Sequence, residues 1–255
     1  MKFTLWMAGI TAAGLLTSGA AQALLIDRGG GLIYDNVLNL TWLKDANYAM
    51  TSGYDADGRM TWDTTTAWAA GLSYYDSVRN VTFDDWRLPT LIDTGSPGCN
   101  EAYSGTDCGY NVDTATSEMA HLYFVSLGNQ SYYTTTGANS GAYAGGANPN
   151  STLDNVGPFI NIQSSGGYSA VYWLGLEYAP NTNIAWDFVT SYGSQGGNWK
   201  TNSRYAWAVR SGDVAAAPAP SGVPEPATVG LLALGLLGLG MTRRRGVAAL
   251  RASAP

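Results

Sequence analysis

The side chains best suited to binding a ligand lie late in the chain. Trp199 and Lys200 directly follow the Gly196-Gly197-Asn198 stretch, so we expect both in an exposed loop. Glu177 and Tyr178 end an earlier apolar run. An exposed indole face suits a sugar ring, and neighbouring polar groups can fix its orientation by hydrogen bonds. The sequence therefore predicts a glycan-binding site at Trp199, Lys200, Glu177 and Tyr178.

Acidic residues beside tryptophans offer a second interpretation. Asp84 and Asp85 precede Trp86, and Asp187 follows Trp186. A glycosidase needs two carboxylates at a set separation, one of them with a raised pKa. The sequence does not give that separation, and the strand-like surroundings of these tryptophans favour packing in the core. Hydrolysis of an extracellular polysaccharide therefore stays the main alternative to binding, and a purely structural biofilm component is a third possibility.

A single histidine limits the available chemistry. His121 is the only one, which excludes histidine-dependent triads and multi-histidine zinc sites. On a regular helix it falls on the face away from Met119 and Leu122, so we expect a surface histidine rather than a general base. Arg87 and Arg210 are expected to form ion pairs of the scaffold. These patterns predict no catalytic residue.

The segment Asp55-Ala56-Asp57-Gly58 resembles the opening of a calcium loop. Position 12 of such a loop would be Thr66 instead of glutamate, which rejects an EF-hand. A calcium site involving Asp55 or Asp57 and a plain solvated turn both remain open. No other cofactor or metal is expected.

The two cysteines, Cys99 and Cys108, lie nine positions apart. In an exported chain two cysteines most simply pair, so we expect a disulfide. A thiol nucleophile or a pair of metal ligands is the alternative, but no histidines surround them.

The N-terminus has the pattern of a secretory signal peptide. Lys2 is followed by an apolar run and then by Ala21-Gln22-Ala23. A charged start, a short apolar middle and small residues at the cleavage site define such a signal. Residues 1–23 are therefore expected to be removed, which leaves Leu24 as the first residue; an uncleaved anchor is the alternative.

The other end has the layout of a membrane-anchored tail. An Ala/Pro-rich linker is expected at 213–222, because such segments cannot build a core. Residues 223–246 contain an apolar helix flanked by Arg243, Arg244 and Arg245, which would hold residues 247–255 in the cytoplasm. The preceding domain would then lie outside the cytoplasm.

Pro224, Glu225 and Pro226, the apolar helix and the arginines together resemble the PEP-CTERM sorting signal of Gram-negative bacteria. The resemblance implies an exosortase as partner, transient anchoring in the inner membrane, and delivery to the cell surface or extracellular matrix. A plain C-terminal anchor is the alternative.

Composition separates the middle of the chain from its ends. Of the 13 basic residues, five lie in the terminal segments, whereas 18 of the 19 acidic residues lie between residues 24 and 222. Binding to nucleic acid is excluded because phosphates require clustered cations. All 16 tyrosines and eight of the nine tryptophans also lie there, which is enough aromatic surface for a core.

Residues 24–212 show no break in composition, so we expect one domain. A hairpin is predicted from 30–35 and 40–43, a helix starting near Thr61, and a short strand at 81–83. A second helix is predicted over about 117–127, with Thr116 as N-cap and Gly128 as stop. Strands are expected at 159–163, 170–174, 184–190 and 205–210. This order predicts an α+β fold with two helices and a mostly antiparallel sheet.

A second resemblance rests on motifs in a fixed order. They are Leu40-Thr41-Trp42-Leu43-Lys44-Asp45-Ala46-Asn47, Met60-Thr61-Trp62, Asp85-Trp86-Arg87-Leu88-Pro89-Thr90, Glu118-Met119-Ala120-His121-Leu122, Tyr172-Trp173-Leu174-Gly175-Leu176-Glu177-Tyr178 and Tyr205-Ala206-Trp207-Ala208-Val209-Arg210. Together they resemble the DUF1566 family, also described as the C-terminal domain of the Legionella collagen-like adhesin. The resemblance implies a single C-type-lectin-like domain, a fold distantly shared with formylglycine-generating enzymes, whose two-cysteine site is not recognisable here.

The chain departs from that family in two places. Residues 93–113 intervene before the second helix, and Leu174 and Leu176 stand where the family often has small hydroxyl residues. The resulting expectation is a non-enzymatic, adhesin-like module that binds an extracellular polysaccharide or a cell-surface glycan.

Overall fold

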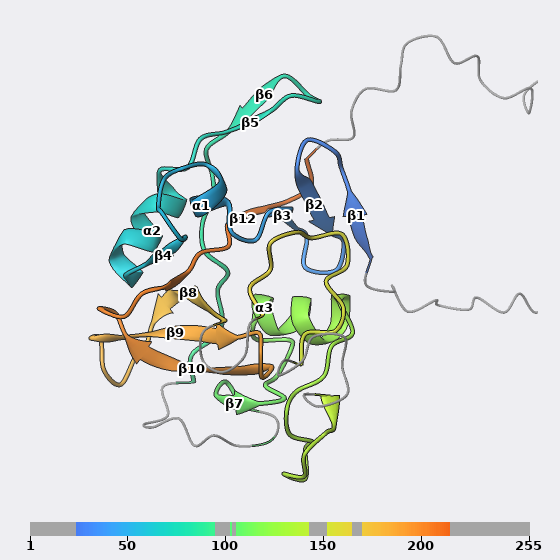
Figure 1. Ribbon diagram of the computed structural model, residues 1–255, viewed down its shortest axis with the longest axis vertical. Helices are drawn as coiled ribbons and strands as arrows, with labels where there is room; N and C mark the ends of the chain where they lie inside the picture. Colours follow the sequence, from blue (N-terminus) through green and yellow to red (C-terminus); the bar gives the residue numbers. More distant parts are fainter. Residues whose placement is uncertain (1–23, 95–102, 104–105, 143–151, 165–169, 215–255) are drawn as a thin grey trace, which may run out of the picture. The chain divides into compact units, whose positions relative to one another are not determined.

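The computed structural model describes residues 24–94, 103, 106–142, 152–164 and 170–214 (Figure 1). These residues all belong to the first of two compact units, Met1–Ala215. The signal segment 1–23 and the tail, including Pro224, Glu225, Pro226 and the three arginines, lie outside the described residues. In the part of the chain that is described, no helix combines the length and apolar character needed to cross a membrane.

The fold is mixed, with more sheet than helix, and most strand pairs in the described residues are antiparallel. One sheet has the order β1-β2-β3-β12 and a larger one the order β4-β11-β8-β9-β10-β7, while β5 and β6 form a separate hairpin. Only the β11–β8 pair is parallel among these strands. The strands are β1 (Leu25–Asp27), β2 (Leu32–Asp35), β3 (Leu40–Leu43), β4 (Arg59–Met60), β5 (Tyr74–Asp76), β6 (Val81–Phe83), β7 (Gly109–Tyr110), β8 (Val171–Glu177), β9 (Ile184–Val189), β10 (Ser194–Trp199), β11 (Arg204–Tyr205) and β12 (Val209–Ser211).

The predicted first hairpin is confirmed as β2 and β3. Its turn is set by Asp35, whose Oδ1 accepts hydrogen bonds from the backbone N–H groups of Val37 and Leu38 at 3.0 and 3.1 Å. Asn39 takes a left-handed φ of 53°, a conformation that asparagine tolerates better than most residues. Local turn chemistry therefore fixes this register.

The first predicted helix is also confirmed. Helix α2 (Trp62–Ala70) has Thr61 as its N-cap, and the Thr61 side chain accepts a hydrogen bond from the Thr64 N–H. A shorter helix, α1 (Tyr48–Thr51), precedes it. Capping of this kind satisfies one of the N–H groups that a helix start leaves unpaired.

The second predicted helix forms but changes type within its length. Helix α3 (Glu118–Ala120) continues as the π-helix η1 (His121–Ser126), and its N-cap is Ser117 instead of Thr116. A π-helix has a wider turn than the 3.6-residue period. His121, the first residue of η1, is buried, so the prediction of a surface histidine is wrong.

Two strand predictions need correction. Residues 159–163 form no strand, only a single bridge between Ile160 and Asp45. The stretch 205–210 is divided between β11 and β12, which belong to different sheets. By contrast, the strands expected at 170–174 and 184–190 are confirmed as β8 and β9.

Aromatic side chains join the elements into one core. The Trp207 ring lies 5.2 Å from Trp42 and 4.9 Å from Phe159, and its indole N–H donates to the Leu43 carbonyl at 2.8 Å. On the larger sheet, Phe188 of β9 packs against Tyr123 of η1 at 5.3 Å. Figure 1 shows the helix labelled α3 beside β9 and β10. One face of this sheet is therefore covered by a helix.

The insertion at residues 93–113 is anchored at its base. Ile92 N–H donates to the Thr116 carbonyl at 2.8 Å, so the chain leaves and re-enters at neighbouring points. Its last part supplies β7, which pairs with β10 at the edge of the larger sheet. The insertion thus extends the larger sheet by one strand.

The packed part of the chain extends two residues into the predicted linker. Val214 is buried, and the carboxylate of Asp213 pairs with the Arg28 guanidinium. The folded unit therefore runs through Val214 instead of ending at 212.

Candidate functional site

Trp199 is the exposed tryptophan of the described residues. Its exposed fraction is 55 %, whereas the other tryptophans from Trp42 to Trp207 are buried or, for Trp62, half-buried. The exposure expected from the sequence is confirmed. Its position is different, because Trp199 is the last residue of β10, opposite Ile184, and does not lie in a loop.

Lys200, the next residue, is brought together with Glu177, which lies opposite Ala185 and therefore on the sheet face away from the Trp199 side chain. The Lys200 ammonium pairs with the Glu177 carboxylate and lies 4.4 Å from the centre of the Trp62 ring. The Trp62 indole is itself fixed by donating to the Leu174 carbonyl at 2.8 Å. A cation held by a carboxylate and an aromatic face is well oriented. We call Trp199, Lys200 and Glu177 the Trp199 surface.

Tyr178 does not take part in this surface as an exposed platform. Its exposed fraction is 8 %, and its ring packs edge-on against Trp186 at 5.2 Å. Trp173 and Trp186 are likewise buried. Tyr178 is therefore a packing residue, because the β8–β9 turn folds it onto the sheet instead of outward.

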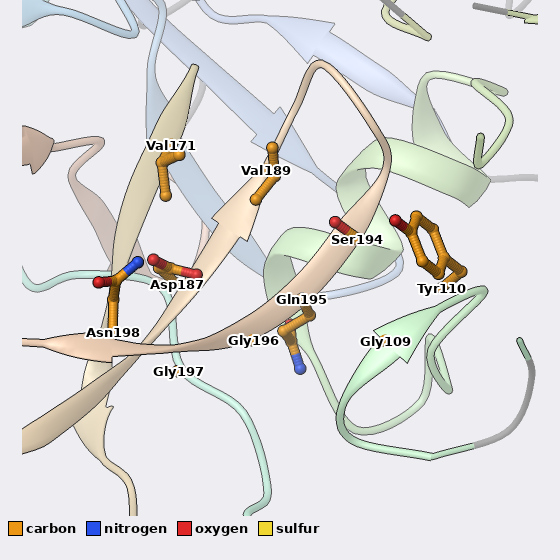
Figure 2. Close-up of a pocket in the computed structure, with 10 residues that line it drawn as sticks. All are labelled: Gly109, Tyr110, Val171, Asp187, Val189, Ser194, Gln195, Gly196, Gly197 and Asn198. Carbon is orange, nitrogen blue, oxygen red and sulfur yellow. The ribbon is translucent and has the colours of Figure 1, made fainter. Parts of the chain in front are cut away.

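A pocket of about 160 Å³ lies on the larger sheet, on the face opposite η1. Alternation along β9 and β10 places Asp187, Gly196 and Asn198 on this face, while Phe188 and Trp199 point to the other. Figure 2 shows Asp187 and Asn198 pointing toward one another at one end of the pocket, with Tyr110 beside Ser194 at the other. Residues lining this pocket, which we call the Asp187 pocket, are Gly109, Tyr110, Val171, Asp187, Val189, Ser194, Gln195, Gly196, Gly197 and Asn198.

Asp187 is buried, with 3 % of its surface exposed. Burial raises its pKa to about 7, although the Arg204 cation and the Asn198 side chain favour the charged form. The Arg204 Nε lies 3.8 Å from Asp187 Oδ2, too far for a hydrogen bond. Within the described residues neither of these two atoms has a hydrogen-bond partner. Asp187 is therefore an acid with a pKa near 7, and its carboxylate lies close to Arg204 without being hydrogen-bonded to it.

Five tyrosines gather at the Tyr110 end of the pocket. The Tyr133 ring is the centre, 4.8 Å from Tyr110, 4.7 Å from Tyr132 and 5.2 Å from Tyr103. Asn111 joins the segments by donating from Nδ2 to the carbonyls of Tyr103 and Tyr133 at 2.7 and 2.8 Å. The members of this tyrosine cluster are Tyr103, Tyr110, Tyr132, Tyr133 and Tyr192.

The arginine predictions are confirmed. Arg87 makes two 2.7 Å hydrogen bonds to Glu118, and Arg210 bonds both carboxylate oxygens of Asp85. The Arg210 contact lowers the pKa of Asp85, which therefore stays charged near neutrality. Asp84 is exposed. Asp187 has the raised pKa of a proton donor, and it is the one carboxylate among the residues that line its pocket.

The Asp55–Gly58 segment forms a tight turn. Asp55 Oδ1 accepts from the backbone N–H groups of Asp57 and Gly58, and Asp57 Oδ1 accepts from that of Arg59. Over the described residues, no group of three or more His, Cys, Asp and Glu side chains could hold a metal ion. Calcium binding here stays a prediction.

The cysteine pairing also stays a prediction. Cys108 is buried directly before β7, whereas Cys99 lies outside the described residues.

Sequence reasoning missed the Asp187 pocket and the tyrosine cluster. Both depend on chain segments far apart in sequence, such as β7 against β10. The available signal was the occurrence of Tyr132-Tyr133 and Tyr192 in polar, glycine-rich surroundings instead of strand patterns.

The chain thus combines a sheet-rich mixed domain with a distinct tail. Residues 222–245 match the PEP-CTERM protein-sorting motif. The motif implies an exported protein of Gram-negative bacteria that is transiently anchored in the membrane and processed by an exosortase. No curated protein and no solved structure is significantly similar to this chain. The DUF1566 resemblance and the C-type-lectin-like fold remain predictions from the motifs quoted above.

Proposed function

We propose that this exported protein is a non-enzymatic, adhesin-like module of the cell surface or extracellular matrix that binds glycans through the Trp199 surface. The observation that carries the proposal is the exposed Trp199 indole at the end of a rigid strand. A sugar ring stacking on it would bury apolar area that otherwise faces water.

The polar part of the surface supports the same function. Glu177 accepts and Lys200 donates hydrogen bonds, so together they match sugar hydroxyls, which do both. Trp62 holds Lys200 in place, which reduces the conformational entropy lost on binding. An exposed aromatic side chain without polar neighbours would not by itself indicate a binding site, since single exposed apolar residues are common on protein surfaces.

Glycan-array binding with residues 24–214 tests the function. We expect the protein to bind a restricted set of neutral glycans or polysaccharides and to leave them uncleaved. Absence of binding to every glycan would contradict the proposal.

The hydrolase alternative is favoured by one observation, the raised pKa of buried Asp187. A reducing-end assay on each retained polysaccharide separates the two functions. Release of new reducing ends would show that the protein is a hydrolase and not a binding module. Asp187→Asn would then abolish that release.

A further inference from the structure

We propose that the Asp187 pocket is a second binding site, which takes a neutral, hydroxyl-bearing group no larger than one sugar residue. The first step is the unsatisfied polar contact. Asp187 Oδ2 and Arg204 Nε, both without a hydrogen-bond partner in the described residues, come from β9 and β11. A buried polar atom without a partner costs free energy, so such atoms point to a missing water or ligand.

The second step concerns charge. An anionic ligand would be repelled by the Asp187 carboxylate, and a cationic one by Arg204, which lies outside the pocket lining but 3.8 Å from that carboxylate. A neutral hydroxyl avoids both penalties because it donates and accepts hydrogen bonds. It can therefore bond Asp187 in either of its protonation states.

The third step concerns shape. The pocket has room for about five water molecules of ~30 Å³ each, which suits a single ring or a smaller polyol. Gly196 contributes no side chain, and a Cβ there would meet only Asp187 Oδ1, at 3.9 Å. The carboxylate is thus reachable across Gly196. Tyr110, at the opposite end, belongs to the tyrosine cluster and offers an aromatic wall.

The two sites are separate. Asp187 and Gly196 lie on one face of the sheet and Trp199 on the other. The proposal rests on the proposed function only for the class of ligand, a sugar. Failure at one site is therefore distinguishable from failure at the other.

The test uses the purified full-length protein and methyl glycosides of glucose, galactose, mannose and N-acetylglucosamine. Saturation-transfer NMR at pH 7 and millimolar sugar detects affinities in the weak range expected for one ring. We expect at least one glycoside to bind the wild type. Gly196→Ala, which places a methyl group in front of Asp187, should weaken binding about tenfold or more.

Asp187→Asn provides a second variant of nearly the same shape, and it should also weaken binding. Tyr75→Ala, at an exposed tyrosine of β5 that belongs to neither site, should leave this binding unchanged. Thermal unfolding of each variant checks that the fold persists. The proposal is overturned if no glycoside binds, if Trp199→Ala alone removes the binding, or if binding survives both pocket variants when they are combined with Trp199→Ala.

Discussion

Asp187 is a buried acidic residue whose pKa is raised by its burial. Asp27 and Asp85 are ion-paired with Lys44 and Arg210, and these contacts lower their pKa values. In Asp187 burial outweighs the attraction of Arg204, which stays 3.8 Å away. The residue is consequently sensitive to pH in the neutral range.

This sensitivity gives a prediction for stability. The pKa of Asp187 is about 7 in the fold and near 3.8 in the unfolded chain, so the folded state holds its proton more tightly. Its contribution to stability is complete below about pH 4 and is lost as the pH rises to about 7. The free energy of unfolding should fall over this range, by on the order of 4 kcal/mol at the limit.

Asp187→Asn should remove this decrease because asparagine does not titrate. Urea unfolding of both proteins at several pH values between 4 and 8 measures it. Asp27 and Asp85 act in the opposite sense and near or below about pH 4, so they do not mask the effect. An identical pH dependence in both proteins would show that Asp187 is charged throughout.

At the scale of elements, β10 connects both candidate sites. Its alternation presents Trp199 on one face and Gly196 with Asn198 on the other. Gly196 has no side chain, which leaves room for the pocket on the Asp187 face. A single six-residue strand thus carries two surfaces.

The sequence predicts most elements but not this strand. The hairpin of β2 and β3, helix α2 and strands β8 and β9 follow from apolar periodicity and turn residues. Strand β10 was missed because Gly196 and Gly197 have low strand propensity. Pairing with β9 on one side and β7 on the other overrides that propensity.

Some features of the candidate site could likewise be predicted from the sequence and others could not. The exposure of Trp199 and the location of Lys200 beside it could be inferred from local sequence. The burial of Tyr178 and His121 could not, because it depends on contacts between segments that are far apart in the sequence. The Asp187 pocket requires four strands in contact, which no local pattern reveals.

The insertion supplies a prediction of its own. Cys99 and Cys108 should form a disulfide, since two cysteines in an exported chain meet an oxidising compartment. The loop is short, so its closure should stabilise the fold by about 2–3 kcal/mol at most. Thiol titration of the denatured, unreduced protein should find no free thiol, and the reduced control should give two. Two thiols without reduction would rule the bridge out.

At the scale of the whole molecule, the tail determines where the domain goes. The sorting motif at 222–245 follows the folded unit after a short Ala/Pro-rich stretch. The motif belongs to the second compact unit, Ala216–Pro255, and the described core to the first, Met1–Ala215. Sorting and binding should therefore be independent properties.

Replacing Pro224, Glu225 and Pro226 with alanines tests this separation. The variant should stay in the membrane with its tail uncleaved, because the exosortase recognition residues are lost. Its folded domain should keep the wild-type melting temperature. Cell fractionation with mass spectrometry of the tail measures the outcome, and unchanged release would contradict exosortase processing.

The most direct measurement of the central claim is the affinity of Trp199→Ala for a glycan that the wild type retains. Calorimetry should show a loss of roughly 1–3 kcal/mol in binding free energy, the scale of an interface anchor. The melting temperature should hardly change because Trp199 is 55 % exposed. Tyr75→Ala, at a tyrosine that is 58 % exposed on β5, is the matched control and should bind like the wild type. Unchanged affinity in Trp199→Ala, or an equal loss in Tyr75→Ala, would contradict glycan binding at the Trp199 surface.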